Sequence, residues 1–297
     1  MSRVPLADAP VSPTGDAGAG VNQPGAGLED KHRALRRLLD GIPSLIVAYS
    51  GGVDSAFLAH IASDVLGSRV LCVTADSPSY PDRHRRMARD LAERFGFHHE
   101  IIHTAELERP EYRANPANRC YYCKHELYSH LTGIARERGI AVIADGSNAD
   151  DRGDYRPGRQ AAGEFGVRSP LDDVGLTKEE IRELSRRAGL PTWDEPASAC
   201  LSSRIPYFSE VTDEKLRTIE RAEEILRDLG FRICRVRHHE TIARIELGRD
   251  EMPRALEADM AATIDRELRA LGYQHVVVDL RGYRLGSLND ALRLRPV

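Results

Sequence analysis

Apolar and polar positions follow two alternating patterns over residues 28–207. Leu45 to Tyr49 is a short apolar run typical of a buried parallel strand, and from Asp54 onward apolar residues recur at helical spacing. The same patterns predict strands over 70–74, 99–103 and 140–144 and helices over 83–95, 124–138 and 179–188. Strands that alternate with helices favour an α/β fold with a doubly wound parallel sheet, which binds ligands at the carboxyl ends of its strands.

The pattern changes near residue 207. It predicts a helix over 213–229, strands over 232–238 and 242–247, a helix over 252–271 and a strand over 275–280. This order favours a smaller α+β domain with a mainly antiparallel sheet. We therefore predict a tail at 1–27, a large domain at 28–207 and a small domain at 208–297. The small domain is expected to bind substrate and to support assembly into a homo-oligomer.

Composition narrows the classes of partner. The chain has 297 residues, 30% of them charged, and a formal net charge of −4, so it lacks the overall basic character typical of nucleic-acid binding. Its apolar runs are shorter than a membrane span. Residues 1–27 are rich in Gly, Pro and Ala without the apolar core of a signal peptide, which predicts a disordered tail and a cytoplasmic protein.

The turn between the first strand and the first helix contains Ser50, Gly51, Gly52, Asp54 and Ser55. The glycines allow close approach of the backbone, and the free N–H groups and dipole of the helix's first turn favour a bound phosphate. The serines add hydroxyl donors, and Asp54 could hold a magnesium ion on the phosphates. A plain glycine turn is the alternative. The motif S-G-G-x-D-S resembles the PP-loop of the ATP pyrophosphatases, which implies cleavage of ATP between its α and β phosphates.

Polar residues also follow two later strands of the predicted sheet. Asp76 and Ser77 come after the second strand, and Gly146, Asn148 and Asp150 come after the last strand of the large domain. The carboxyl ends of parallel strands meet at one edge of a sheet, so we expect these residues to contact ATP. Helix caps and turns are the alternative role for such residues.

The five cysteines divide into two groups. Cys72 and Cys234 lie in apolar strand patterns, as buried small hydrophobes do. Cys120 and Cys123 have C-x-x-C spacing just before a predicted helix, and Cys200 lies in a predicted loop. Three thiolates could hold three irons of a [4Fe–4S] cluster and leave the fourth iron open to an outside ligand. Free thiols or a redox pair are the alternatives.

Three arginines mark a further candidate site. Arg204 follows Cys200, and Arg235 and Arg237 alternate along a predicted strand, so their side chains point to the same side. Such a pair could bind phosphate or carboxylate groups by bidentate hydrogen bonds. A solvated strand face on which an arginine pairs with Glu246 is the alternative.

The segments AYSGGVDS, NRCYYCK, DGSNADDRGDYRPG, PASACLSSRIPY and VRHHETIARIEL together resemble the LarE family of ATP-dependent sulfur transferases, which act in making a nickel-pincer nucleotide cofactor. The resemblance implies that ATP activates a carboxylate of pyridinium-3,5-biscarboxylic acid mononucleotide as an acyl-adenylate, with release of pyrophosphate. A sulfur nucleophile then displaces AMP and leaves a thiocarboxylate. By resemblance the PP-loop residues hold ATP, and Arg204, Arg235 and Arg237 face the substrate. Glu223 and Glu246 fall in matching segments.

Within the resemblance, the pattern of cysteines indicates the source of the transferred sulfur. Some members of the family sacrifice one cysteine, which becomes dehydroalanine, and those members lack the C-x-x-C pair. This chain has Cys120, Cys123 and Cys200, the pattern of members that resemble iron–sulfur enzymes. We therefore expect a catalytic Cys200 and a sulfide carried on a [4Fe–4S] cluster. The alternatives are a tRNA thiolase, an amide-forming PP-loop synthetase and a non-catalytic nucleotide-binding sensor.

Overall fold

The structure is a computed structural model and describes residues 27–289 except 154–156, 197–198 and 285. Apart from Gly27, the predicted tail lies outside the described residues. Within the described ranges, no helix combines the length and the apolar character needed to cross a bilayer.

Four strands form the larger sheet, in the order β3-β2-β1-β4. They are β1 (Leu45–Ala48), β2 (Val70–Asp76), β3 (His99–His103) and β4 (Val142–Ala144). All of their pairings are parallel, and Val47 of β1 lies between Cys72 of β2 and Ala144 of β4. The predicted α/β fold with a parallel sheet is confirmed.

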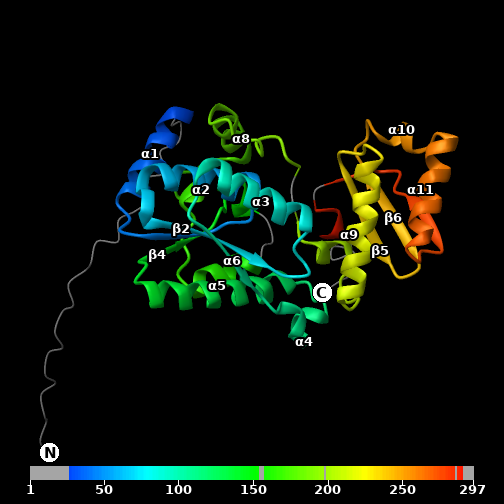
Figure 1. Cartoon of the computed structure of the whole chain (residues 1–297), viewed down its shortest axis with the longest axis horizontal. Coiled ribbons are helices and arrows are strands. Elements are labelled where there is room, and N and C mark those ends of the chain that lie inside the picture. The colour runs from blue at the N-terminus through cyan, green and yellow to red at the C-terminus, as the bar shows by residue number, and fades with distance from the viewer. Residues whose placement is uncertain (1–26, 154–156, 197–198, 285, 290–297) are drawn as a thin grey trace, which may run out of the picture.

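Helices cover both faces of this sheet (Figure 1). One face packs against α1 (Leu28–Asp40), α2 (Val53–Leu66), α3 (Asp82–Phe95) and α8 (Lys178–Arg187), and the other against α5 (Arg119–Arg138) and α6 (Pro157–Glu164). The short helices α4 (Pro110–Arg113) and α7 (Pro170–Asp173) lie in the connections. Leu58 and Leu91 belong to the first core and Leu131 to the second. Because both faces are covered, ligands reach the sheet at the strand ends.

A second sheet has the order β5-β6-β7 and a core of its own. Its strands are β5 (Cys234–His239), β6 (Ile242–Leu247) and β7 (His275–Val278), and its helices are α9 (Asp213–Asp228), α10 (Met252–Ala255) and α11 (Ala258–Ala270). In Figure 1, α9 lies on the side of this sheet that faces the larger one. The backbone N–H of Asp82 on α3 donates to Glu220 on α9 at 2.6 Å. The predicted boundary near residue 207 lies between Arg204 and α9, and the division into domains stays a prediction.

The second sheet is mixed, not mainly antiparallel. β5 and β6 are antiparallel, but β6 and β7 are parallel. The chain between β6 and β7 runs through α10 and α11, and such a helical crossover brings a strand back in the same direction. The single helix predicted over 252–271 is two helices, because Glu257 is extended (ψ 138°) between them.

The helix with the C-x-x-C motif begins earlier than predicted. It starts at Arg119 and not at Lys124, so Cys120 and Cys123 lie in its first two turns. Tyr121 packs on the core between the larger sheet and α5, whereas Cys123 packs on a separate core that includes Tyr112 and Leu201. Contacts on two sides stabilise the first turn of α5, and they are tertiary contacts that the local pattern does not contain.

Candidate active site

The PP-loop joins β1 to α2, and its close packing requires glycine at two positions, Gly51 in the loop and Gly146 in the turn after β4. Gly51 has φ +65°, and a Cβ atom there would lie 2.8 Å from the Ala88 Cβ atom. A Cβ atom on Gly146 would lie 2.9 Å from the Ser55 backbone nitrogen. The Ser55 hydroxyl accepts from the Ser50 N–H and donates to the Gly52 carbonyl, both at 3.1 Å. These contacts hold the loop below the N-terminus of α2, where an anion is favoured.

Asp54 lies in the first turn of α2. Its Oδ2 atom is 2.5 Å from the Lys178 ammonium, which sequence analysis did not select. Its Oδ1 atom is buried and has no hydrogen-bond partner within the part of the chain that the structure describes. Burial raises the pKa of Asp54, and Lys178 opposes that shift. Because magnesium prefers oxygen ligands, an unpaired buried carboxylate oxygen fits a magnesium site.

The predicted strand-end residues lie at one edge of the larger sheet, since β2, β1 and β4 are adjacent and parallel. Ser77 donates to the Glu106 carboxylate at 2.5 Å. The Asn148 side chain accepts from the Asp150 N–H at 3.0 Å, and Asp150 accepts from the Lys178 N–H at 2.8 Å. Asn148 and Asp150 therefore shape the turn after β4. Contact with ATP by these residues, by Asp76 and by Gly146 stays a prediction.

Three cysteines come from two segments that the fold ties together. Cys120 and Cys123 lie on α5, and Cys200 precedes η4 (Leu201–Arg204). The Arg119 guanidinium donates to the Ser202 carbonyl at 2.9 Å, and the hydroxyls of Tyr112 and Ser202 are 2.6 Å apart. The Arg119 contact holds the Cys200 segment against the C-x-x-C helix, and the Tyr112 contact holds it against α4. The sequence analysis selected neither residue.

The three thiols influence one another electrostatically. Desolvation by the surrounding protein raises the pKa of Cys120; Arg119 and Lys124 lower it, and Cys200 adds to the rise. Burial raises the pKa of Cys123, and Glu106 and Cys200 raise it further. Among the residues with described positions, no group of three His, Cys, Asp or Glu side chains has the arrangement of a metal site. The donor set, three cysteine thiols beside two cations, has the chemistry of an iron–sulfur ligand set.

The other two cysteines are buried in strands, as predicted. Cys72 and Cys234 are both fully buried. Burial raises the pKa of Cys72 to about 12 and that of Cys234 to about 11. Both are thiols inside hydrophobic cores.

The predicted arginines lie in a buried cluster made by η4, α9 and β5. Arg204 pairs with Glu223 at 2.8 Å, and its Nη1 atom donates to the Cys200 carbonyl at 3.0 Å. Arg237 pairs with Glu246 at 2.6 Å. The Arg235 guanidinium lies 5.2 Å from the centre of the Tyr283 ring.

The β5 face that carries these arginines is not solvated. Arg235 is 8% and Arg237 is 6% exposed, so the alternative of a solvated strand face does not hold. The Nε atom of Arg237 is buried and has no hydrogen-bond partner among the described residues. An unpaired buried guanidinium donor is suited to an anionic ligand, because leaving it unpaired costs free energy.

Glu106 and Lys124 also lie near the cysteines and were missed by sequence analysis. Glu106 is 2% exposed and accepts from both Ser77 and Ser79. Lys124 follows the C-x-x-C pair directly, and its ammonium lies 5.5 Å from the centre of the Tyr128 ring. The position of Lys124 next to the motif was a usable signal. Glu106 has no local signal, because its role depends on the turn after β2.

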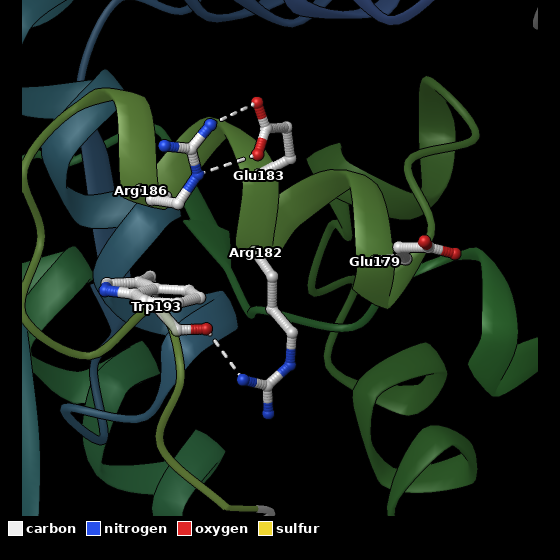
Figure 2. Close-up of a pocket in the computed structure, with 5 residues that line it drawn as sticks. All are labelled: Glu179, Arg182, Glu183, Arg186 and Trp193. Carbon is white, nitrogen blue, oxygen red and sulfur yellow. Dashed lines mark hydrogen bonds and ion pairs between the residues drawn. The ribbon is translucent and has the colours of Figure 1, made fainter.

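A concave surface lies on α8 and at Trp193, in the segment that follows this helix (Figure 2). It is lined by Glu179, Arg182, Glu183, Arg186 and Trp193 and has a volume of about 400 Å³. Figure 2 shows the Arg182 side chain turned toward the Trp193 carbonyl, to which it donates at 2.6 Å. Arg182 also lowers the pKa of Asp54, less than Lys178 does.

The parallel sheet and the loop between β1 and α2 define a PP-loop ATP pyrophosphatase. A model of the asparagine synthase family matches residues 32–117. An uncharacterized protein of Synechocystis sp. is 43% identical over 265 residues, which is 89% of this chain and 99% of that protein. The pyridinium-3,5-bisthiocarboxylic acid mononucleotide synthase of Lactiplantibacillus plantarum is 37% identical over 271 residues, 90% of this chain and 96% of that enzyme.

A glutamine-hydrolyzing GMP synthase polypeptide of Methanopyrus kandleri is 27% identical over 225 residues, which is 68% of each chain. Within the PP-loop class, the extent of the match to the Lactiplantibacillus enzyme decides the family. The chain belongs to the LarE family and is an ATP-dependent sulfurtransferase.

Proposed function

We propose that this protein uses ATP to activate a carboxylate of pyridinium-3,5-biscarboxylic acid mononucleotide and replaces a carboxylate oxygen with sulfur. The observation that carries the proposal is the hydrogen bond from the Leu201 N–H to the Ser79 carbonyl, at 2.8 Å. It places the Cys200 segment beside the loop that follows β2. A sulfur centre there lies next to the sheet edge at which a PP-loop enzyme binds ATP.

In the first step, a substrate carboxylate oxygen attacks the α-phosphorus of ATP, and pyrophosphate leaves with the electron pair of the bond that breaks. The N–H groups of the first turn of α2 and the hydroxyls of Ser50 and Ser55 bind the departing phosphates. Asp54 would hold a magnesium ion, which stabilises the charge of the leaving group when bound. The carboxylate needs this activation because its negative charge repels nucleophiles.

In the second step, a sulfur nucleophile attacks the carbonyl carbon of the acyl-adenylate, and AMP leaves. We propose that Cys120, Cys123 and Cys200 hold a [4Fe–4S] cluster, which supplies the transferable sulfur when bound. Two cations support this assignment. Desolvation raises the pKa of Cys120, and Arg119 and Lys124 oppose that rise, which favours the deprotonated thiol that binds iron.

The arginine cluster is assigned to the substrate, which carries a phosphate and two ring carboxylates. Arg235 and Arg237 provide planar guanidinium groups on one strand face, and such groups pair bidentately with carboxylate and phosphate. Arg204 contributes a third guanidinium beside Cys200. Glu223 holds Arg204 in place and Glu246 holds Arg237, each through an ion pair.

Product analysis tests the function. The protein, reconstituted with iron and sulfide without oxygen, is incubated with ATP, magnesium and the pyridinium nucleotide, and the products are separated by mass spectrometry. We expect AMP, pyrophosphate and the thiocarboxylate in equal amounts. Cys200→Ala should form no thiocarboxylate, whereas Cys72→Ala should. ADP as the product, or wild-type thiocarboxylate formation by Cys200→Ala, would contradict the proposal.

Iron content tests the ligand assignment separately. After the same reconstitution, iron should be lost from the variants Cys120→Ala, Cys123→Ala and Cys200→Ala and kept in Cys72→Ala and Cys234→Ala. The two controls remove thiols that lie inside hydrophobic cores. Iron bound at the wild-type level by a variant that lacks all three predicted ligands would refute the assignment.

A further inference from the structure

Lys178 and Asp54 form an ion pair across the mouth of the PP-loop. The two residues are 124 positions apart in the sequence, and the Nζ and Oδ2 atoms are 2.5 Å apart. The lysine side chain is 31% exposed and that of Asp54 23%. An ammonium group has three donors, and Asp54 takes one of them. The other two can serve a ligand that lies above the loop.

The backbone of Lys178 is fixed, so that only its side chain needs to move. Thr177 caps α8, with its hydroxyl accepting from the Glu180 N–H and the Glu180 carboxylate accepting from the Thr177 N–H. The Lys178 N–H donates to Asp150 at 2.8 Å, and Asp150 is one of the predicted ATP residues. Lys178 thus connects the loop after β4 to the PP-loop.

Charge favours contact between this ammonium and ATP. The triphosphate of ATP carries several negative charges, and the carboxylate of Asp54 alone would repel it. Arg182, one turn further along α8, is held by the Trp193 and Glu195 carbonyls at 2.6 Å. Its guanidinium stays where those carbonyls hold it. The Lys178 side chain has a single flexible stem, so it can turn between the carboxylate and a nearby phosphate.

We propose that Lys178 is a further ATP-binding residue, whose ammonium is shared between Asp54 and a phosphate of ATP and thereby leaves Asp54 available to magnesium. The proposal rests on the proposed use of ATP at the PP-loop. Its alternative is a purely structural lysine that only neutralises Asp54. The two roles differ in what happens when Asp54 loses its charge.

A double-mutant cycle separates the two roles. The dissociation constant of ATP is measured by equilibrium dialysis in EDTA, so that no metal takes part, for wild type, Lys178→Met, Asp54→Asn and the double variant. We expect Lys178→Met to weaken ATP binding by roughly 10-fold or more, the effect of a lost charged hydrogen bond. The same loss is expected when Asp54→Asn is already present, because the lost contact is to ATP.

Lys31→Met is the matched control. Lys31 pairs with Glu180 on the same helix at 2.7 Å, and its side chain is 19% exposed. This variant should bind ATP as wild type does. The double variant removes both members of the Lys178–Asp54 pair and so leaves no unpaired buried charge, which keeps the test usable if Lys178→Met is unstable.

Two outcomes would overturn the proposal. If Lys178→Met weakens ATP binding only while Asp54 is present, the ammonium serves Asp54 alone. If it has no effect in either background, Lys178 does not contact ATP. The measurement involves no sulfur transfer, so a failure of the proposed sulfur chemistry would not change its reading.

Discussion

Arg204 and Glu223 form a two-point ion pair, at 2.8 and 3.1 Å, in which both side chains are only 1% exposed. Arg204 also donates to the carbonyls of Ala199 and Cys200, and Glu223 belongs to α9. The pair therefore fixes the backbone of the Cys200 segment against the helix that covers the second sheet. A buried charge pair of this kind is sensitive to the loss of either partner.

We predict that Arg204→Met lowers the free energy of unfolding by about 3 kcal/mol, because the buried Glu223 carboxylate loses its two-point ion pair and keeps the ion pair to Arg227. Arg204→Met combined with Glu223→Met should recover much of this loss. Urea denaturation of the two single variants and the double variant measures the effect. Equal stability of wild type and Arg204→Met would show that the pair contributes nothing.

The same pair predicts a loss of stability in acid. Burial opposes the ionisation of Glu223, but Arg204, Arg235 and Arg227 lower its pKa to about 2, below its ordinary value of 4.5. The folded protein thus keeps this carboxylate charged where the unfolded chain takes up a proton. Its contribution to stability is complete above about pH 4.5 and is lost as the pH falls toward 2.

Unfolding at a series of pH values measures this contribution. Between about pH 5 and about pH 2, the free energy of unfolding of wild type should fall by on the order of 3 kcal/mol more than that of Glu223→Gln. Parallel pH profiles for the two proteins would contradict the shifted pKa.

Two glycines with the same backbone angle should respond differently to substitution. In Gly51→Ala the alanine would have to adopt a φ of +65° and its Cβ atom would clash with the Ala88 side chain. We therefore expect the free energy of unfolding to fall by roughly 2 kcal/mol or more and ATP turnover to be lost. Gly96 has a φ of +68°, but a Cβ atom there would contact nothing. Gly96→Ala should therefore lower the free energy of unfolding by about 1 kcal/mol and leave ATP turnover unchanged. Thermal unfolding and pyrophosphate release measure both. Equal effects of the two variants would show that the close contact at Ala88 is unimportant.

Arg235→Ala should weaken binding of the pyridinium nucleotide by about 1.5–3 kcal/mol, the range for a charged hydrogen bond, and leave ATP binding unchanged. Separate titrations with the two ligands measure this difference. Arg237→Ala should have the same effect on the substrate, but it also removes the partner of the buried Glu246. Its melting temperature must therefore be compared with that of Arg235→Ala. Equally weakened binding of both ligands would indicate misfolding or a wrong domain arrangement, and unchanged binding of both would place these arginines outside the substrate site.

The local patterns of the larger sheet were sufficient to predict its fold. The apolar run that begins at Leu45 and the glycines that follow it form a pattern that can be recognised from one short segment alone. The structure has the predicted strand, turn and helix in that order. The first turns of α5 were missed because they depend on Tyr121 and Cys123 packing against two different cores. Assembly into a homo-oligomer and a cytoplasmic location stay predictions.

The residues of the candidate site that belong to a sequence motif were predictable, whereas those that reach it through tertiary contacts were not. Asp54 was found from the PP-loop, but its partner Lys178 lies 124 positions away and looks like an ordinary first residue of a helix. Glu223 was selected by resemblance, but the sequence does not show that this carboxylate on α9 pairs with Arg204.

The most direct test of the account is the intact mass of the denatured protein after many turnovers without oxygen and with a supply of sulfide. We predict that the mass of the chain is unchanged, because the transferred sulfur is carried on a cluster held by Cys120, Cys123 and Cys200 and is replaced from outside. A loss of one molecule of hydrogen sulfide from the chain, located by peptide mapping as dehydroalanine at Cys200, would contradict this account and show that the protein supplies its own sulfur.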